Sequence, residues 1–201
     1  MTQPATLTDK LDRAFTYARE HHANDIRKGT AIPYLSHLLG VCSLVLDMEG
    51  SEDEAIAALL HDVIEDGGGV EAEVVIRAEF GEDVARIVRA CSDTDEDPKP
   101  PWRPRKVEYI DAIAHKQPDE LRVSLADKLH NARAILLDYR TAGDALWGRF
   151  SAGRDEQLWY YGALASGFEA RRDDLGAAAG PAVDELRRVV EEIALVSAST
   201  T

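Results

Sequence analysis

The chain has 201 residues, of which 45% are hydrophobic and 30% charged, so disordered and collagen-like classes are excluded. This length suits one domain and buries enough apolar surface for a stable core. The formal net charge of −14 excludes a general attraction to nucleic acid polymers or to an anionic membrane.

Apolar residues recur with helical spacing along most of the chain, which predicts an all-α fold. A first helix is expected from about Thr8 to His22. Pro33 can open a second, central helix that is apolar on nearly every side and stops at Gly50.

A third helix is expected after Ser51, because Ser51 followed by Glu54 forms a capping-box pattern. It should continue to the glycines at 67–69, which places His61 to Asp66 in its last turns.

The rest of the chain is expected to form helices, apart from one loop. The loop is the segment Ser92 to Pro104, which is acidic and rich in proline and which can act as a lid. Helices are expected at about Ala72–Glu79, Glu82–Cys91, Arg105–His115, Glu120–Tyr139, Arg154–Arg171 and Val183–Val196. No domain boundary is evident, so residues 1–201 are expected to form one domain: a motif-bearing core at about 7–164, on which C-terminal helices at about 154–197 pack.

The cysteines and the N-terminus indicate in which cellular compartment the protein is expected. Cys42 and Cys91 are far apart and fit no metal-binding spacing, so neither a disulfide framework nor a thiolate site is indicated. The N-terminus has no apolar signal region, and the longest mostly apolar run, Leu38 to Leu46, is far below the roughly 20 residues of a membrane span. A soluble, cytoplasmic protein is expected.

Four ionisable groups crowd into six residues as His61, Asp62, Glu65 and Asp66, next to an apolar run. Burying unpaired carboxylates is costly, and a divalent cation bound by carboxylate and imidazole removes that cost. On this segment alone, a solvated acidic helix end explains the residues equally well.

Two more segments repeat the pattern. His37 lies in the most hydrophobic predicted helix, and Asp127 interrupts the apolar stripe of a later one. An isolated core histidine is more often hydrogen-bonded than ligating. Three helices together, however, offer His37, His61, Asp62 and Asp127 as metal ligands, with positions left for water and substrate.

The order His, His-Asp, Asp, with Glu65 and Asp66 after the pair, resembles the HD-domain metal-dependent phosphohydrolases. More narrowly, it is similar to the hydrolase domain of the Rel/SpoT alarmone enzymes and to the small stand-alone alarmone hydrolases. The motifs that carry the resemblance are Arg27-Lys28, Pro33-Tyr34 with His37, His61 to Asp66, and Ala126 to Asn131 with Arg133. The chain ends soon after this region, so a synthetase role is not expected.

The resemblance implies an HD-domain helical bundle that uses manganese to remove the 3′-pyrophosphate of (p)ppGpp, a small-molecule nucleotide substrate. It assigns His37, His61, Asp62 and Asp127 to the metal, and Glu65 and Asp66 to proton transfer and positioning of water. It assigns Arg27, Lys28 and Asn131 to the nucleotide. Lys128 and Arg133, beside Asp127, are further candidates for the phosphates because of their charge.

Departures from the family fall in the nucleotide pocket. The stretch Lys28 to Pro33 is one residue longer than in the long alarmone enzymes, Leu38 stands where they often have proline, and Ala134 replaces a hydroxyl residue. The basic aromatic cluster from Trp102 to Tyr109 could receive phosphates or simply start a solvated helix.

Two other functions stay open. An HD phosphohydrolase of another substrate class, such as a 5′-nucleotidase, would keep the ligands and change the pocket. A non-catalytic, metal-stabilised regulatory module is the other alternative, but it would not need Glu65 and Asp66 beside the ligands.

Overall fold

The structure, a computed structural model, describes residues 5–94, 96 and 98–198. Its α-helices are α1 (Asp9–His21), α2 (Leu35–Asp47), α3 (Glu52–Leu60), α4 (Gly69–Phe80), α5 (Glu82–Cys91), α6 (Trp102–Ile113), α7 (Pro118–Ala142), α8 (Arg154–Ala170), α9 (Arg172–Leu175) and α10 (Gly180–Ala198). Three short helical segments complete it: η1 (Ile64–Gly68), η2 (Gly143–Arg149) and η3 (Ala177–Ala179). Within these residues the fold is all-α, as the sequence predicts; an isolated bridge between Ile26 and Pro33 is the extended pairing.

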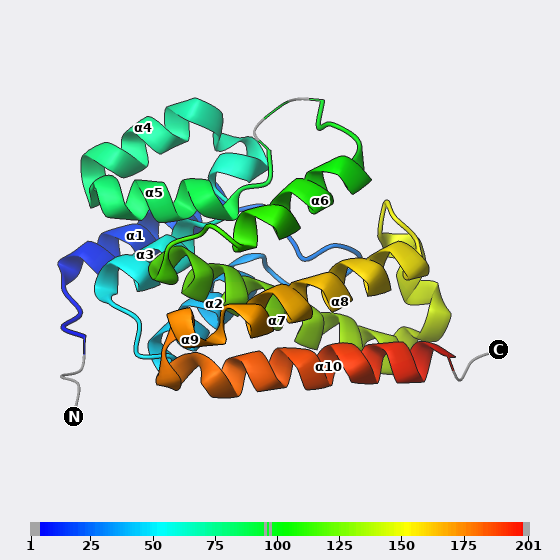
Figure 1. Ribbon diagram of the computed structural model, residues 1–201. Helices are drawn as coiled ribbons and strands as arrows, with labels where there is room; N and C mark the ends of the chain where they lie inside the picture. The colour runs from blue at the N-terminus through cyan, green and yellow to red at the C-terminus, as the bar shows by residue number, and fades with distance from the viewer. Residues whose placement is uncertain (1–4, 95, 97, 199–201) are drawn as a thin grey trace.

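The longest helix, α7, organises the molecule (Figure 1). It packs against α2, α3 and α5 on one side and against α8 and α10 on the other. Its buried stripe includes Leu121, Leu125, Leu129, Ala132 and Leu136 at helical spacing. Residues of α7 therefore lie between the N-terminal and C-terminal helices.

The start of α3 is tied to α7 through one glutamate. The predicted capping box forms, with the Ser51 amide donating to Glu54 Oε2 at 2.7 Å. Glu54 Oε1 accepts a hydrogen bond from Arg122 of α7. Because breaking a buried ion pair typically costs about 3–5 kcal/mol, this contact helps to fix α3 on α7.

The end of the third helix differs from the prediction. Regular α-helix stops at Leu60, and the chain continues into η1, where the Gly68 amide donates to the Val63 carbonyl five residues back. Gly67 has φ 97°, a backbone conformation that favours glycine. His61 to Asp66 thus lie in a turn and in the kinked segment η1, where Asp66 and Gly67 have non-helical backbone angles, and not in the last turns of an α-helix.

The other helix boundaries agree with the sequence within about three residues. Helix α6 begins at Trp102, three residues earlier than expected, so the loop before it is Ser92 to Pro101. The predicted connection to the last helix contains α9 and η3. Asp95 and Asp97 of the acidic loop lie outside the described residues. Among the described helices, none is both long and apolar enough to cross a membrane.

Candidate active site

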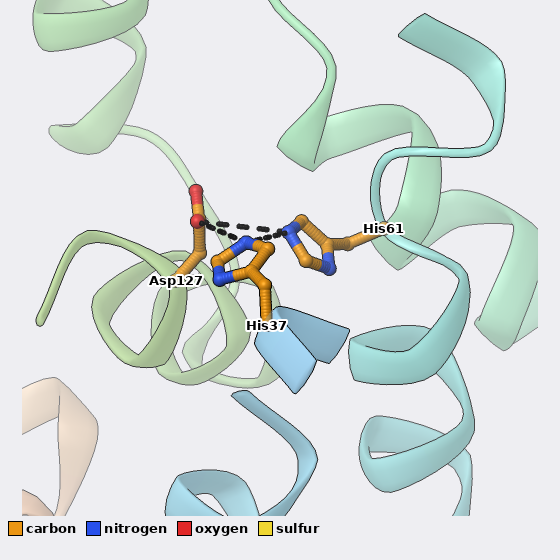
Figure 2. Close-up of side chains that lie close together, drawn as sticks. All are labelled: His37, His61 and Asp127. Carbon is orange, nitrogen blue, oxygen red and sulfur yellow. Dashed lines mark hydrogen bonds and ion pairs between the residues drawn. The ribbon is translucent and has the colours of Figure 1, made fainter. Parts of the chain in front are cut away.

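Three helices bring His37, His61 and Asp127 together in the interior. His37 lies in the first turn of α2, His61 follows the last residue of α3, and Asp127 is in the middle of α7. Their exposed fractions are 1%, 1% and 5%. Figure 2 shows the two imidazole rings and the carboxylate facing one common point.

The fourth predicted ligand, Asp62, joins this group. His37 Nε2 is 3.3 Å from His61 Nε2 and 3.2 Å from Asp127 Oδ1. Asp62 Oδ2 lies 3.0 Å from His61 Nε2 and 3.6 Å from His37 Nε2. We call His37, His61, Asp62 and Asp127 the ligand cluster.

These distances fit a shared cation. Two ligand atoms that each lie about 2.1 Å from a metal, at right angles, are about 3.0 Å apart. The donor set of two imidazole nitrogens and two carboxylates suits a borderline divalent metal. The ligand cluster therefore has the composition and spacing of a divalent metal site.

The pKa shifts of the residues in the ligand cluster also favour a cation at its centre. Burial lowers the pKa of His37, which favours the neutral imidazole that a metal needs. Burial opposes charge on His61 too, but Asp62 and Asp127 outweigh it and raise the pKa of His61. Burial is likewise outweighed at both carboxylates: His61 holds the pKa of Asp62 low, and Lys128 does so for Asp127.

Each histidine is oriented through its second nitrogen. His61 Nδ1 donates to the Ala58 carbonyl oxygen at 2.8 Å, which leaves its Nε2 lone pair for a metal. His37 Nδ1 lies 2.9 Å from His130 Nδ1. His130 thus lies against the His37 nitrogen that faces away from the ligand cluster.

Asp127 is held by its neighbours on α7. Asn131 Nδ2 donates to Asp127 Oδ1 at 2.6 Å, and Lys128 Nζ lies 2.7 Å from Asp127 Oδ2. Arg27 Nη2 in turn donates to Asn131 Oδ1 at 2.9 Å. The loop before α2 is thereby linked to the ligand cluster.

The acidic pair after the ligand cluster lies in η1. Glu65 Oε1 accepts a hydrogen bond from Lys99 at 2.9 Å, so the loop before α6 contacts this carboxylate. Burial and the nearby carboxylates of Asp62 and Glu65 raise the pKa of Asp66 to about 7. A carboxyl group with such a pKa can exchange protons near neutral pH.

A cavity of about 400 Å³ adjoins the ligand cluster. Tyr34 lines it and donates a hydrogen bond to Asp62 Oδ2 at 2.5 Å, which connects the cavity with the cluster. The cationic residues that line it are Arg27, Lys28, Lys106, Lys128 and Arg149. Its apolar wall includes Ile32, Trp102, Ile135, Leu146 and Phe150.

Four of the five predicted nucleotide contacts line this cavity: Arg27, Lys28, Lys128 and Asn131. Arg133 is not among the lining residues. Its guanidinium donates twice to Glu185 of α10, at 2.7 and 2.6 Å, because its position on α7 faces α10. Arg133 therefore lies on the side of α7 that faces α10, outside the lining of this cavity.

The residues of the basic aromatic cluster, Trp102 to Tyr109, make two kinds of contact. Trp102 and Lys106 line the cavity. Arg105 Nη1 instead donates hydrogen bonds to both carboxylate oxygens of Asp93, at 2.6 and 2.7 Å. Lys106 also donates to Asp93, whose side chain is only 3% exposed. Asp93 was not predicted to have a role; the basic residues that follow the acidic loop were the signal that could have identified it.

Sequence reasoning also missed the wall formed by η2 and α8. Leu146, Arg149 and Phe150 line the cavity together with Tyr160 and Tyr161, which also belong to the buried core. None of these residues belongs to a motif, so no pattern in the sequence marked them.

The all-helical fold and the ordered set His37, His61-Asp62 and Asp127 define an HD-domain protein. The sequence profile described as HD domain matches residues 14–156. The chain belongs to this family, which confirms the resemblance inferred from its motifs.

Among individual proteins, the chain is similar to human guanosine-3′,5′-bis(diphosphate) 3′-pyrophosphohydrolase MESH1. The two are 34% identical over 136 residues, covering 67% of this chain and 72% of the human protein. The enzyme named guanosine-3′,5′-bis(diphosphate) 3′-pyrophosphohydrolase in Haemophilus influenzae is 32% identical over 121 residues, covering 59% of this chain and 17% of that protein. A solved structure, described as a metazoan ortholog of SpoT that hydrolyses ppGpp, matches with a TM-score of 0.70 and 25% identity. That match covers 94% of this chain and 97% of the other.

Proposed function

We propose that the protein is a manganese-dependent hydrolase that removes the 3′-pyrophosphate of guanosine 3′,5′-bis(diphosphate) and of its 5′-triphosphate counterpart. The observation that carries this proposal is the position of the ligand cluster next to a cavity lined by several cations. The similarity to enzymes named for this reaction supports it.

The charge of the cavity suits a substrate with several phosphates. The chain as a whole has a net charge of −14 and repels polyanions at long range. Arg27, Lys28, Lys106 and Lys128 gather on the cavity wall and supply a local opposing charge. A diphosphate beside the ligand cluster gains more from this charge than a single phosphate does.

The ligand cluster would hold the metal through His37, His61, Asp62 and Asp127. When bound, a divalent ion supplies positive charge that polarises a phosphate group and makes nearby water more acidic. The choice of manganese rests on the family resemblance.

In the reaction we infer, water attacks the phosphorus attached to the ribose 3′ oxygen. The hydroxyl of water joins the departing diphosphate, and the 3′ oxygen takes a proton, which gives GDP or GTP and pyrophosphate. Glu65 and Asp66 orient the water and transfer the proton, since both carboxylates follow the ligand cluster in η1. Asn131 and Lys128 hold Asp127, and Arg27 and Lys28 bind phosphates.

Chromatography of products tests the proposal. With manganese present, the purified protein should convert ppGpp to GDP and pyrophosphate. Release of inorganic phosphate from nucleoside monophosphates, with ppGpp intact, would instead favour the 5′-nucleotidase alternative. No turnover of any nucleotide by the metal-loaded protein would favour the regulatory module.

Arg27→Met and Arg133→Met form a matched pair for the binding site. Arg27 lines the cavity, whereas Arg133 pairs with Glu185 outside it. The first variant should raise KM for ppGpp about tenfold or more, and the second should leave KM close to that of the parent. Equal effects would contradict the placement of the phosphates beside Arg27.

A further inference from the structure

The end of the cavity away from the ligand cluster contains a carboxylate. Asp127, Asn131 and Asp138 follow one another at spacings of four and seven residues, so they share one face of α7. Asp138 lies 11 residues beyond Asp127, which corresponds to about 16 Å along the helix axis. Both Asn131 and Asp138 line the cavity, so α7 runs along it from the ligand cluster to Asp138.

Asp138 is held on one side and free on the other. Its Oδ2 accepts a hydrogen bond from Arg149 Nη1 at 2.8 Å, and its side chain is 35% exposed. In the described part of the chain, Asp138 makes no second hydrogen bond or ion pair. It is also the one carboxylate among the residues that line the cavity there.

The surroundings of Asp138 suit a flat ring better than a phosphate. Leu146 of η2 and Phe150, which directly follows η2, line the cavity. Ile135, one turn before Asp138 on α7, lines it as well. At position 134, one turn before Asp138, an alanine offers no polar group. A carboxylate in such a wall repels phosphates and accepts hydrogen bonds from a base.

We propose that Asp138 selects guanine by accepting hydrogen bonds from the N1–H and N2–H groups of the base. Guanine presents two adjacent donors on this edge, which match the two oxygens of a carboxylate. Adenine presents one donor and one acceptor there, and hypoxanthine lacks the N2 amino group. This inference rests on the proposed function, since it places the diphosphate at the ligand cluster and the base at the other end of the cavity.

Arg149 is a positioning residue for this carboxylate. Its side chain crosses Gly29, where a Cβ atom would lie 2.6 Å from Arg149 Cδ. Gly29 has φ 72° and directly follows Lys28, so the stem of Arg149 covers the loop that carries the phosphate-binding cations. The pair of Arg149 and Asp138 thus fixes the carboxylate relative to that loop.

The test compares guanosine, inosine and adenosine 3′,5′-bis(diphosphates) as substrates of the manganese-loaded protein. The parent should prefer guanosine over inosine about tenfold in kcat/KM, and over adenosine by more. In Asp138→Asn the amide presents a donor to the guanine donors, so kcat/KM should fall about 10- to 100-fold for guanosine and change little for the other two.

Arg149→Met is the control for the ion pair. It keeps a carboxylate at position 138 and removes the residue that orients it, so part of the preference for guanosine should be lost. If Asp138→Asn slows all three substrates equally, or if Arg149→Met loses more of the guanosine preference than Asp138→Asn does, the assignment of Asp138 to the base is wrong.

Calorimetric titration with GDP and IDP, on the same proteins, separates this inference from the proposed function. Tighter binding of GDP by the parent, lost in Asp138→Asn, supports the role of Asp138 even if no 3′-diphosphate is cleaved. Cleavage of all three substrates at equal rates, with equal binding of GDP and IDP, would keep the proposed hydrolase and overturn the role of Asp138.

Discussion

His37 and His130 face each other through their Nδ1 atoms, 2.9 Å apart. Helices α2 and α7 come close enough for this contact because position 40 is glycine: a Cβ atom there would lie 2.2 Å from His130 Nε2. Burial and the nearby His37 lower the pKa of His130 to about 4, so His130 is neutral at physiological pH. Its Nδ1 can then accept a hydrogen bond from His37 Nδ1.

His130→Ala should therefore weaken metal binding without removing a ligand. Loss of a partner of this kind typically reduces metal affinity about 10- to 100-fold. Gly40→Ala should have an effect in the same direction, because the new methyl group displaces the His130 ring. Titration calorimetry with manganese measures both affinities. A dissociation constant unchanged in both variants would show that His37 needs no support from His130.

Manganese should stabilise the folded protein through the ligand cluster. A ligand at 100 times its dissociation constant adds about 2.7 kcal/mol to the free energy of unfolding, which corresponds to a rise in Tm of roughly 5–10 °C for a chain of this size. Thermal unfolding with manganese or with a chelator measures the rise. His61→Ala should show no such difference, and a rise of the same size in that variant would place the ion elsewhere.

Glu65→Gln should separate metal binding from chemistry. The substitution keeps the shape of a side chain that contacts Lys99 and removes its ability to take a proton. Turnover of ppGpp should drop about 10²- to 10⁴-fold, while the metal content measured by elemental analysis stays at the parent level. Glu71→Gln, on the exposed face of α4, is the control. Equal rates for the parent and Glu65→Gln would remove this residue from the mechanism.

Asp93 should make stability depend on acidic pH. Burial alone would raise the pKa of Asp93, but Lys106 and Arg105 outweigh it and hold the pKa below its ordinary value. The ion pairs therefore contribute stability above about pH 4, the pKa of an unfolded aspartate, and this contribution is lost as pH falls through the folded pKa.

Asp93→Asn should be less stable than the parent at pH 7, because Lys106 and Arg105 lose their partner. The difference should shrink as the pH is lowered below about 4. Urea unfolding at several pH values gives both free energies. A difference that stays constant down to the lowest pH at which the protein folds would mean that the Asp93 charge contributes nothing.

Much of the fold follows from local sequence patterns. Ser51 and Glu54 predicted the start of α3 because a capping box needs only neighbouring residues. The ligand cluster was also predictable, since each of its members is a polar residue that interrupts an apolar run. In both cases the signal lies within a few positions of the residue concerned.

The parts that could not be predicted depend on contacts between distant segments. The kinked segment η1 carries Glu65 and Asp66, and no periodicity in the sequence predicts its backbone. The burial of Asp93 depends on how the loop before α6 folds back on Arg105 and Lys106. The pairing of Asp138 with Arg149 requires η2 to return to α7, which the sequence does not encode in any short pattern.

The link between Arg27 and Asn131 joins positions 104 residues apart in the chain. Part of the cavity wall follows Gly143, so a nascent chain that ends before η2 already contains all four residues of the ligand cluster but lacks Arg149 and Phe150. Contacts of such long sequence separation form late and slow the folding of a domain. During synthesis, the residues proposed to hold an ion therefore leave the ribosome before those that complete the wall of the nucleotide cavity.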